Sequence, residues 1–300
     1  REQDEFVAED AEAKRLAEHV KQTGVIDEWI VRKVIGAGAN GLVALVENQK
    51  TNENAVMKIA MNLSTSGSLY WESDVLERIM QPSNNEDRTR HLVRRVDFGH
   101  TVNMDKQDVG YIVMENLPGN PVGILGALSG NALISKVAEF GLQLLKAVYD
   151  LHYLGFVHRD IKPENVGLYH DEILVLYDLG INVKNAIKLT GRVDDLWGWF
   201  YVLIEWMNCA SKYPLCWAAF ENDPDLRHFC KSGLFPAKYR YLRCLGRDDS
   251  PDYLYLAKLL LQAKKTADGT PAAEASAPFA DEENDEKWSQ RMSFLERLYD

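Results

Sequence analysis

The stretch HRDIKPENVGLYHDEILVLYDLG, residues 158–180, gathers charged and amide side chains in a short length of chain. Asp160, Lys162 and Asn165 lie close together, and Asp178 follows the apolar segment ILVLY. Mostly apolar or turn-forming residues separate them, as expected of a loop followed by a small hairpin over 166–177. This grouping predicts that a highly charged ligand binds here.

Each of these side chains suits one part of a phosphoryl transfer. Asp160 can accept a proton from an attacking hydroxyl, and Lys162 can neutralise the transferred group. Asn165 offers a neutral oxygen and Asp178 a charged one, and Mg²⁺ prefers oxygen ligands with few protein contacts. The eight residues HRDIKPEN followed by Asp-Leu-Gly are a far more specific signal than a coincidental polar loop.

A glycine-rich segment earlier in the chain, GAGANGLV, fits the pattern G-x-G-x-x-G-x-V with Gly36, Gly38, Gly41 and Val43. Glycines let the backbone approach a phosphate closely and turn without steric cost. The following LVALVE has the pattern of a strand, whereas a dinucleotide-binding turn would need a helix there. Taken alone, the motif fits a plain hairpin turn equally well.

The next strand ends in AVMK, which places Lys58 among apolar neighbours. A lysine in this position either extends its ammonium group to solvent or pairs with an acid. Glu72, in the middle of a predicted helix over 69–80, is the preferred partner, and Glu77 is the fallback. The pair alone would be consistent with a purely structural salt bridge.

The hydrophobic periodicity changes along the chain. Residues 28–61 alternate like short strands, two more strands are expected at 92–98 and 109–115, and helices are expected at 5–21, 131–154 and 194–207. The last of these is nearly all apolar after a potential N-capping Asp194, which predicts burial. The predicted organisation is an N-terminal helical extension (1–27), a strand-rich lobe (28–116), a helical lobe (117–265) and an acidic tail (266–300).

Composition narrows the function classes. The 300 residues are 46% hydrophobic and 26% charged, with a net charge of −11. Residues 1–30 carry nine acids and four bases, and 271–300 carry eight and three, so most of the acidity belongs to the ends. No segment of the chain is basic enough to predict nucleic-acid binding, and no apolar run is long enough to predict a membrane span. We therefore expect a cytoplasmic location, with the nucleus as the alternative.

The four cysteines are too widely spaced for a metal site. They are expected to be reduced, partly buried thiols. Their positions are Cys209, Cys216, Cys230 and Cys244.

Over about residues 28–265 the chain resembles the eukaryotic protein kinase family, in the glycine-rich loop, AVMK, HRDIKPEN and DLG in place of the commoner DFG. The resemblance implies an α+β bilobal protein kinase fold, with a strand-rich N-lobe and a helical C-lobe, that uses ATP and Mg²⁺. It also implies that Asp195 anchors the catalytic loop. The implied catalytic residues are Asp160, Lys162, Lys58 and Glu72, the implied metal ligands are Asn165 and Asp178, and the implied nucleotide-binding residues are Gly36, Ala37, Gly38, Gly41, Val43, Ala55, Lys58, Met114 as gatekeeper, and Glu115 to Leu117 as the adenine-binding hinge.

The lysine inside DIKPEN resembles Ser/Thr-specific kinases. Two further segments, GRVDDLWGWFYVLIEW and DDSPDYLYLAKLL, resemble the casein kinase 1 group and especially its tau-tubulin kinase branch, which similarly lacks an Ala-Pro-Glu tripeptide. This implies a protein substrate that is acidic, already phosphorylated or cytoskeletal. Lys184, Lys188 and Arg192 could supply the matching positive charge, although exposed basic residues are usually only solvated.

One departure from the family is the short interval LGINVKNAIKLTGRVD between Asp178 and Asp195. Family members have a longer activation segment there, which forms the platform for a protein substrate. Residues absent around 183–187 are the favoured explanation, and a truly short segment is the other. Three functions follow as alternatives: an active Ser/Thr protein kinase, a kinase-shaped nucleotide-binding scaffold or pseudokinase, and a small-molecule kinase.

Overall fold

The computed structural model describes residues 11–39, 41–81, 86–170, 172–179, 191–208, 236–246 and 249–270. The chain divides into two units. Unit 1 comprises Arg1–Asn84, Val93–Asn116 and Asp178–Asn182, and unit 2 comprises Asn85–Leu92, Leu117–Tyr177 and Val183–Asp300. Each unit has its own buried core.

Unit 1 is built on a six-stranded antiparallel sheet with the order β1-β2-β3-β4-β6-β5. Its middle strands bury alternate residues, as a strand with one face against a core should. Met57 and Ile59 are almost completely buried on one face of β4, and Lys58 between them points to the other. The strands are β1 (Val25–Ile26), β2 (Trp29–Gly38), β3 (Gly41–Asn48), β4 (Asn54–Ala60), β5 (Arg95–Val102) and β6 (Asp108–Glu115).

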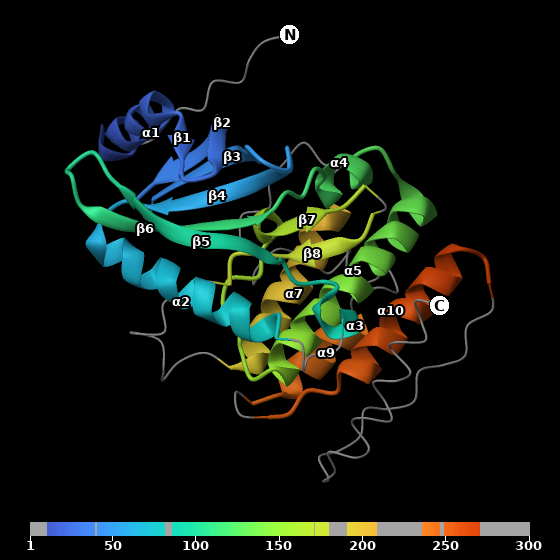
Figure 1. Ribbon diagram of the computed structural model, residues 1–300. Helices are drawn as coiled ribbons and strands as arrows, with labels where there is room; N and C mark the ends of the chain where they lie inside the picture. Colours follow the sequence, from blue (N-terminus) through green and yellow to red (C-terminus); the bar gives the residue numbers. More distant parts are fainter. Residues whose placement is uncertain are drawn as a thin grey trace. The chain divides into compact units, whose positions relative to one another are not determined.

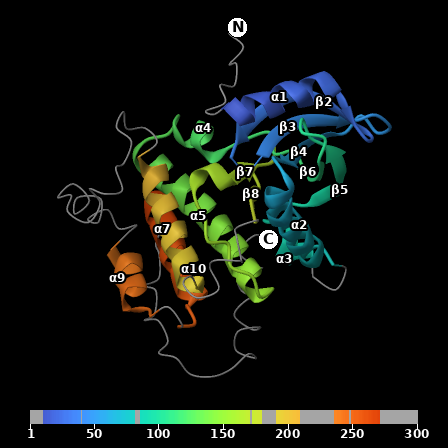
Figure 2. The same cartoon turned by 90° about the vertical axis from the view of Figure 1, so that its left-hand side faces the viewer.

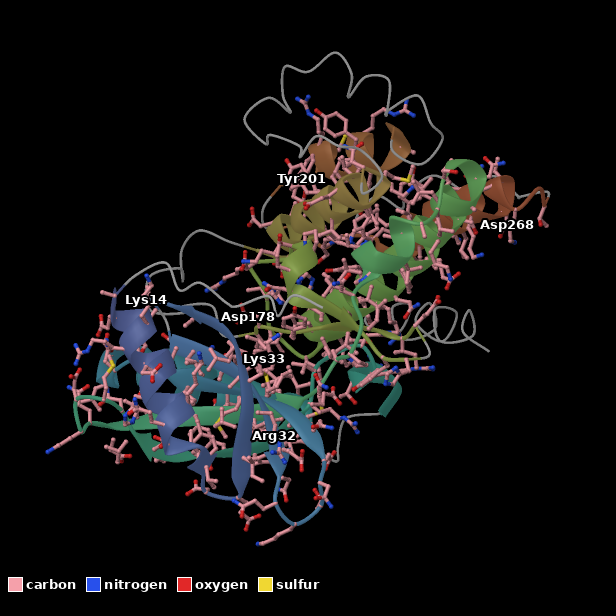
Figure 3. All side chains as sticks on the ribbon, turned by 90° about the horizontal axis from the view of Figure 1, so that it is seen from above. Lys14, Arg32, Lys33, Asp178, Tyr201 and Asp268 are labelled. Carbon is pink, nitrogen blue, oxygen red and sulfur yellow. The ribbon has the colours of Figure 1, made fainter. Side chains whose placement is uncertain are left out.

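Two helices cover the sheet on opposite sides, as Figures 1 and 2 show. α1 (Ala11–Thr23) buries Leu16 and Val20 and contacts β2 and β3. The polar residues Lys14 of α1 and Arg32 and Lys33 of β2 are exposed (Figure 3). α2 (Leu63–Ile79) contacts β4, β5 and β6, and its first turn is fixed by a capping box between Asn62 and Thr65.

Unit 2 is mainly helical, and α5 (Gly130–Tyr153) forms its centre by packing against both α7 and α10 (Figure 2). α5 carries an apolar stripe that is buried along most of its length, including Phe140, Leu144 and Val148. A two-stranded sheet of β7 and β8 contacts it on the β8 side. The other elements are α3 (Glu86–Thr89), α4 (Pro121–Leu125), η1 (Pro163–Asn165), β7 (Val166–Leu168), β8 (Leu174–Leu176), α7 (Arg192–Met207), α9 (Pro236–Cys244) and α10 (Tyr253–Ala267).

The buried helix expected at 194–207 is present, but it begins two residues earlier and is capped differently. Gly191 is the N-cap, and Asp194 is the third helical residue, whose carboxylate accepts a hydrogen bond from the Gly191 N–H at 2.6 Å. The prediction that an aspartate would be the cap itself is therefore wrong. The burial is as expected, since Leu196, Trp199 and Leu203 are inaccessible to solvent.

Two smaller expectations also change. Cys244 is an exposed free thiol, where a partly buried one was predicted, and the other three cysteines lie outside the described residues. The helix predicted at 5–21 is described only from Ala11, and 266–300 only as far as residue 270. Among the described helices, none combines the length and apolar character that a membrane span requires.

His91 makes the stability of unit 2 depend on pH. Its ring is buried and its Nδ1–H donates to the Leu174 carbonyl at 2.7 Å. Burial lowers the pKa of His91 to about 4, with smaller lowering contributions from Lys146 and Arg90. The unfolded chain therefore binds a proton below about pH 6.5 that the folded chain does not, so stability falls as the pH falls from there towards 4.

We expect this residue to cost about 2 kcal/mol of unfolding free energy between pH 7 and pH 5. Urea denaturation at the two pH values measures the cost. His91→Asn keeps a donor near the Leu174 carbonyl but cannot titrate, so it should remove about this much of the difference. An equal pH dependence in the two proteins would contradict the assignment.

Candidate functional site

The glycine-rich hairpin lies where β2 turns into β3. Gly38 pairs with Gly41 across the turn, and Gly36 pairs with Val43. Gly41 has φ +140°, and a Cβ atom there would lie 2.1 Å from the Ile59 carbonyl oxygen, so the fold itself requires glycine at this position. At Gly38 a Cβ would meet nothing within 4 Å, so the fold alone does not explain that glycine.

A matched pair of substitutions separates these two reasons. Gly41→Ala is expected to lower the unfolding free energy by about 2–4 kcal/mol, because the clash is with backbone. Gly38→Ala is expected to change it by less than about 1 kcal/mol, and to weaken nucleotide binding if a phosphate approaches the backbone there. Urea denaturation and nucleotide titration of both variants measure these effects. Equal stability of the two variants would contradict the first expectation.

Lys58 lies one strand further, in register with Val43 on β3 and Ile112 on β6. Its Nζ donates to both carboxylate oxygens of Glu72 at 3.0 and 2.9 Å and to Oδ1 of Asp178 at 2.5 Å. Glu72 is therefore its partner on α2, while Glu77 pairs with Arg95 at 3.2 Å.

The ion pairs of Lys58 keep it charged although it is largely buried. Burial by itself would lower the pKa of Lys58, but the carboxylates of Glu72 and Asp178 outweigh that effect and raise it. Glu72 is 3% exposed, and Asp178, labelled in Figure 3, is about one third exposed. Unit 1 thus presents one fixed positive charge beside a glycine-rich turn, an arrangement suited to binding phosphates.

In unit 2, hydrogen bonds join the three polar side chains of the loop that carries Asp160. Asn165 Nδ2 donates to the Asp160 carbonyl at 2.8 Å and to the Asp160 carboxylate at 3.1 Å. Lys162 Nζ donates to the same carboxylate oxygen. Since the amide nitrogen of Asn165 is bound to Asp160, its oxygen is the atom left to bind a cation. The structure therefore brings together three of the four side chains singled out in residues 158–178.

A buried carboxylate on α7, that of Asp195, accepts hydrogen bonds from the backbone of this loop. The backbone N–H groups of His158 and Arg159 donate to the two oxygens of Asp195 at 2.6 Å each. His158 donates from Nε2 to the Tyr177 carbonyl at 2.9 Å, so its Nδ1 accepts from the Asp160 N–H at 3.2 Å. Arg159 has φ +72°, a left-handed conformation that a non-glycine residue adopts only when its surroundings enforce it.

The part of the chain that carries the Lys58 cluster and the Asp160 loop matches a known protein family. A family model described as "Protein kinase domain" matches residues 29–196, more than half of the chain. The chain belongs to the protein kinase domain family. The match includes the glycine-rich hairpin, Lys58, Asp160 and Asp195.

Named relatives of the kinase domain support this. A probable serine/threonine-protein kinase of Dictyostelium discoideum is 27% identical over 277 residues, covering 77% of this chain and 52% of that protein. Myotonin-protein kinase of Homo sapiens is 30% identical over 203 residues, covering 65% of this chain and 30% of that protein. The chain thus spans about half, or less, of the length of these relatives.

A solved structure of vaccinia related kinase 3 shares the fold, with a TM-score of 0.58 at 15% identity over 81% of this chain and 88% of that chain. The predicted α+β bilobal kinase fold, with a strand-rich N-terminal sheet and a helical C-terminal region, is confirmed.

The residues expected to surround the adenine are placed as follows. Met114 is buried in β6, opposite Val56. Glu115 pairs through its side chain with Arg94 at 2.9 Å, and Leu117, in unit 2, packs over Gly167. Ala37 pairs with Leu42 in the glycine-rich hairpin.

The structure corrects the prediction that Ala55 is one of the nucleotide-binding residues. It is 1% exposed and lies on the face of β4 that Met57 and Ile59 share, which is opposite to Lys58. Val56, two residues before Lys58, is the residue on the same face as that lysine. The two-residue period of the strand, counted back from Lys58, would have identified it.

No local pattern assigned a role to His152, or to Tyr253, which lies beyond the matched residues 29–196. His152 binds Asp195, 43 residues away, and Tyr253, 101 residues away. Only the tertiary structure brings these three helices together. In the interval between Asp178 and Asp195, which was predicted to be short or to lack residues around 183–187, residues 180–190 lie outside the described part of the chain, so both explanations stay predictions.

Proposed function

We propose that the chain is a protein serine/threonine kinase that transfers the γ-phosphoryl group of Mg-ATP to a protein hydroxyl. The observation that carries the proposal is the loop at Asp160, in which the expected base, its neighbouring lysine and the metal-binding amide form one hydrogen-bonded unit. Membership of the protein kinase family and the named Ser/Thr kinase relatives support the same reaction.

In this proposal the residues of unit 1 bind and orient the nucleotide. The backbone at Gly36 and Gly38 approaches the phosphates, and Lys58, oriented by Glu72, binds the α- and β-phosphates. Lys58 is suited to this because its pKa is raised by its two carboxylate partners, so it stays charged at any physiological pH.

The residues of unit 2 act on the hydroxyl and the transferred group. Asp160 orients the substrate hydroxyl and accepts its proton, and Lys162 steadies the γ-phosphoryl group. Lys162 already contacts the Asp160 carboxylate, so the two charges are held together before any substrate arrives.

The residues that would hold Mg²⁺ fit it by their chemistry. Asn165 offers an amide oxygen and Asp178 a partly exposed carboxylate, and Mg²⁺ takes one or two protein oxygens and completes its shell with phosphates and water. In the described part of the chain, no cluster of three or more His, Cys, Asp or Glu is arranged to hold a metal without such help. When bound, the ion neutralises the charge of the phosphates.

We further propose that the kinase lies in or near the casein kinase 1 group, on its tau-tubulin branch, and acts in the cytoplasm or nucleus. The support is the sequence of α7 and of residues 248–260. Acidic, already phosphorylated or cytoskeletal proteins are then the candidate substrates. Arg192, exposed at the start of α7, is one candidate for binding their negative charge, while Lys184 and Lys188 lie outside the described residues.

The interval of only sixteen residues between Asp178 and Asp195 supports one alternative, a nucleotide-binding scaffold without a platform for protein substrates. The two functions differ in product. We would incubate the chain with γ-labelled Mg-ATP and either casein or tubulin, and identify the labelled amino acid. Phosphoserine or phosphothreonine in a protein supports the kinase, whereas Mg-nucleotide binding without any labelled protein supports the scaffold.

A further inference from the structure

Three buried side chains from three helices form a hydrogen-bonded chain beneath the catalytic loop. The Tyr253 hydroxyl, at the start of α10, lies 2.5 Å from Nδ1 of His152 on α5. Nε2 of His152 lies 2.8 Å from Oδ2 of Asp195 on α7. All three side chains are almost inaccessible to solvent, each being about 2% exposed.

The chemistry of the three groups fixes the direction of each hydrogen bond. Burial would raise the pKa of Asp195, but the hydrogen bonds from the His152 side chain and the His158 backbone N–H lower it below the ordinary value, so it is a carboxylate and can only accept. Nε2 of His152 therefore carries the hydrogen. Burial raises the pKa of Tyr253, so its hydroxyl stays protonated and can donate to the lone pair on Nδ1.

The same carboxylate oxygen that His152 contacts also accepts the N–H of His158, at 2.6 Å. The orientation of the His152 ring thus bears on the carboxylate that holds the left-handed backbone at Arg159, the residue before Asp160. A tyrosine hydroxyl that fixes the ring and its tautomer would fix the position of the base in turn.

We propose that Tyr253 is a positioning residue for the catalytic loop, acting through His152 and Asp195. The proposal rests on the proposed phosphoryl-transfer function. It does not give Tyr253 any contact with substrate or nucleotide. Its ring also packs edge-on against Tyr149 at 5.2 Å, a contact that phenylalanine would keep, so only the hydroxyl carries the proposed role.

The first test compares two tyrosines of α10. Tyr253→Phe is expected to lower kcat about tenfold and to leave KM for ATP within about twofold, because small displacements of a catalytic group lower the rate of the chemical step. Tyr255→Phe, the same change two residues on, is the matched control and should leave both constants unchanged. Equal kcat values for Tyr253→Phe and the wild type would overturn the proposal.

A double-mutant cycle tests whether the effect passes through His152. Glutamine at 152 can still donate from Nε2 to Asp195 but has no Nδ1 to receive the tyrosine hydroxyl. In the His152→Gln background, Tyr253→Phe should therefore lower kcat by less than about twofold. The same tenfold loss in both backgrounds would show that Tyr253 acts by another route.

A third measurement depends on neither activity nor the folding of a variant. ¹⁵N-histidine NMR of the wild-type chain should show the His152 hydrogen on Nε2, facing Asp195, and a hydrogen on Nδ1, facing Tyr253, would overturn the proposal. If the wild type transfers no phosphate, the proposed function fails, and the tautomer still decides whether the Tyr253–His152–Asp195 chain is formed.

Discussion

Replacing Lys58 with methionine is expected to lower kcat/KM for phosphoryl transfer by about 10²–10³-fold. Lys58 supplies a positive charge on the Val43 face of β4, bound to both oxygens of Glu72 and to Asp178. Removing a single preorganised charge-stabilising donor from an active site typically costs this much. Steady-state kinetics with Mg-ATP and a protein substrate measures the loss.

The matched control is Lys50→Met, in the same unit. Lys50 also pairs with a glutamate, Glu28, but its side chain is 72% exposed, and exposed pairs contribute little. This variant should keep its activity within about twofold. Similar losses in Lys50→Met and Lys58→Met would contradict a specific role for Lys58.

Glu72 should behave as part of the same unit. Glu72→Gln is expected to lower kcat/KM, and the double variant with Lys58→Met should be little worse than Lys58→Met alone. Fully additive losses would mean that the two side chains act separately, against the geometry of their bidentate pair.

Asp195→Asn is expected to lower stability and rate together. The Asp195 carboxylate accepts two backbone N–H groups and the His152 ring, and it is buried. The side-chain NH₂ group of an asparagine would face at least one of these donors. Neither that NH₂ group nor the donor would then have an acceptor. We expect a loss of about 3 kcal/mol in unfolding free energy and about a hundredfold in kcat.

Asp194→Asn provides the control, since it is the neighbouring residue and the same chemical change. Asp194 accepts a part-buried hydrogen bond from the Gly191 N–H at the start of α7, and helix caps typically contribute about 1 kcal/mol. Its loss should therefore stay near that value, with kcat unchanged. Comparable kcat in the two variants would exclude the proposed anchoring of the loop by Asp195.

The sign of the pH dependence follows from the pKa of Asp195. Because that pKa is lowered below its ordinary value near 3.8, its contribution to stability is complete at neutral pH. The contribution is lost only as the pH falls through the folded-state pKa. The stability difference between wild type and Asp195→Asn should therefore be constant from pH 6 to 8.

The sequence predicted those parts of the site whose residues are close together in the chain and chemically suited to one task. HRDIKPEN places Asp160, Lys162 and Asn165 within reach of one another on a single loop, so spacing alone was sufficient. Glu72 was preferred to Glu77 because it lies in the middle of the predicted helix. The division into a strand-rich and a helical lobe followed from the change of hydrophobic period after residue 116, whereas the kinase fold was implied by the resemblance of the motifs.

Other features depend on tertiary structure and had no local signal. His152 and Tyr253 look like ordinary residues of amphipathic helices, and only the packing of α5, α7 and α10 joins them to Asp195. Ala55 was misassigned because a motif match fixes residue types, whereas the pleat of β4 decides which face each residue occupies.

The most direct test of the account is the rate of phosphoryl transfer at saturating Mg-ATP by the wild-type chain and by Asp160→Asn. Asparagine keeps the size of the side chain but removes the base. The account predicts measurable transfer by the wild type and a loss of about 10²–10⁴-fold in the variant. Equal transfer by the two proteins, or none by a wild type that binds Mg-ATP, would contradict it.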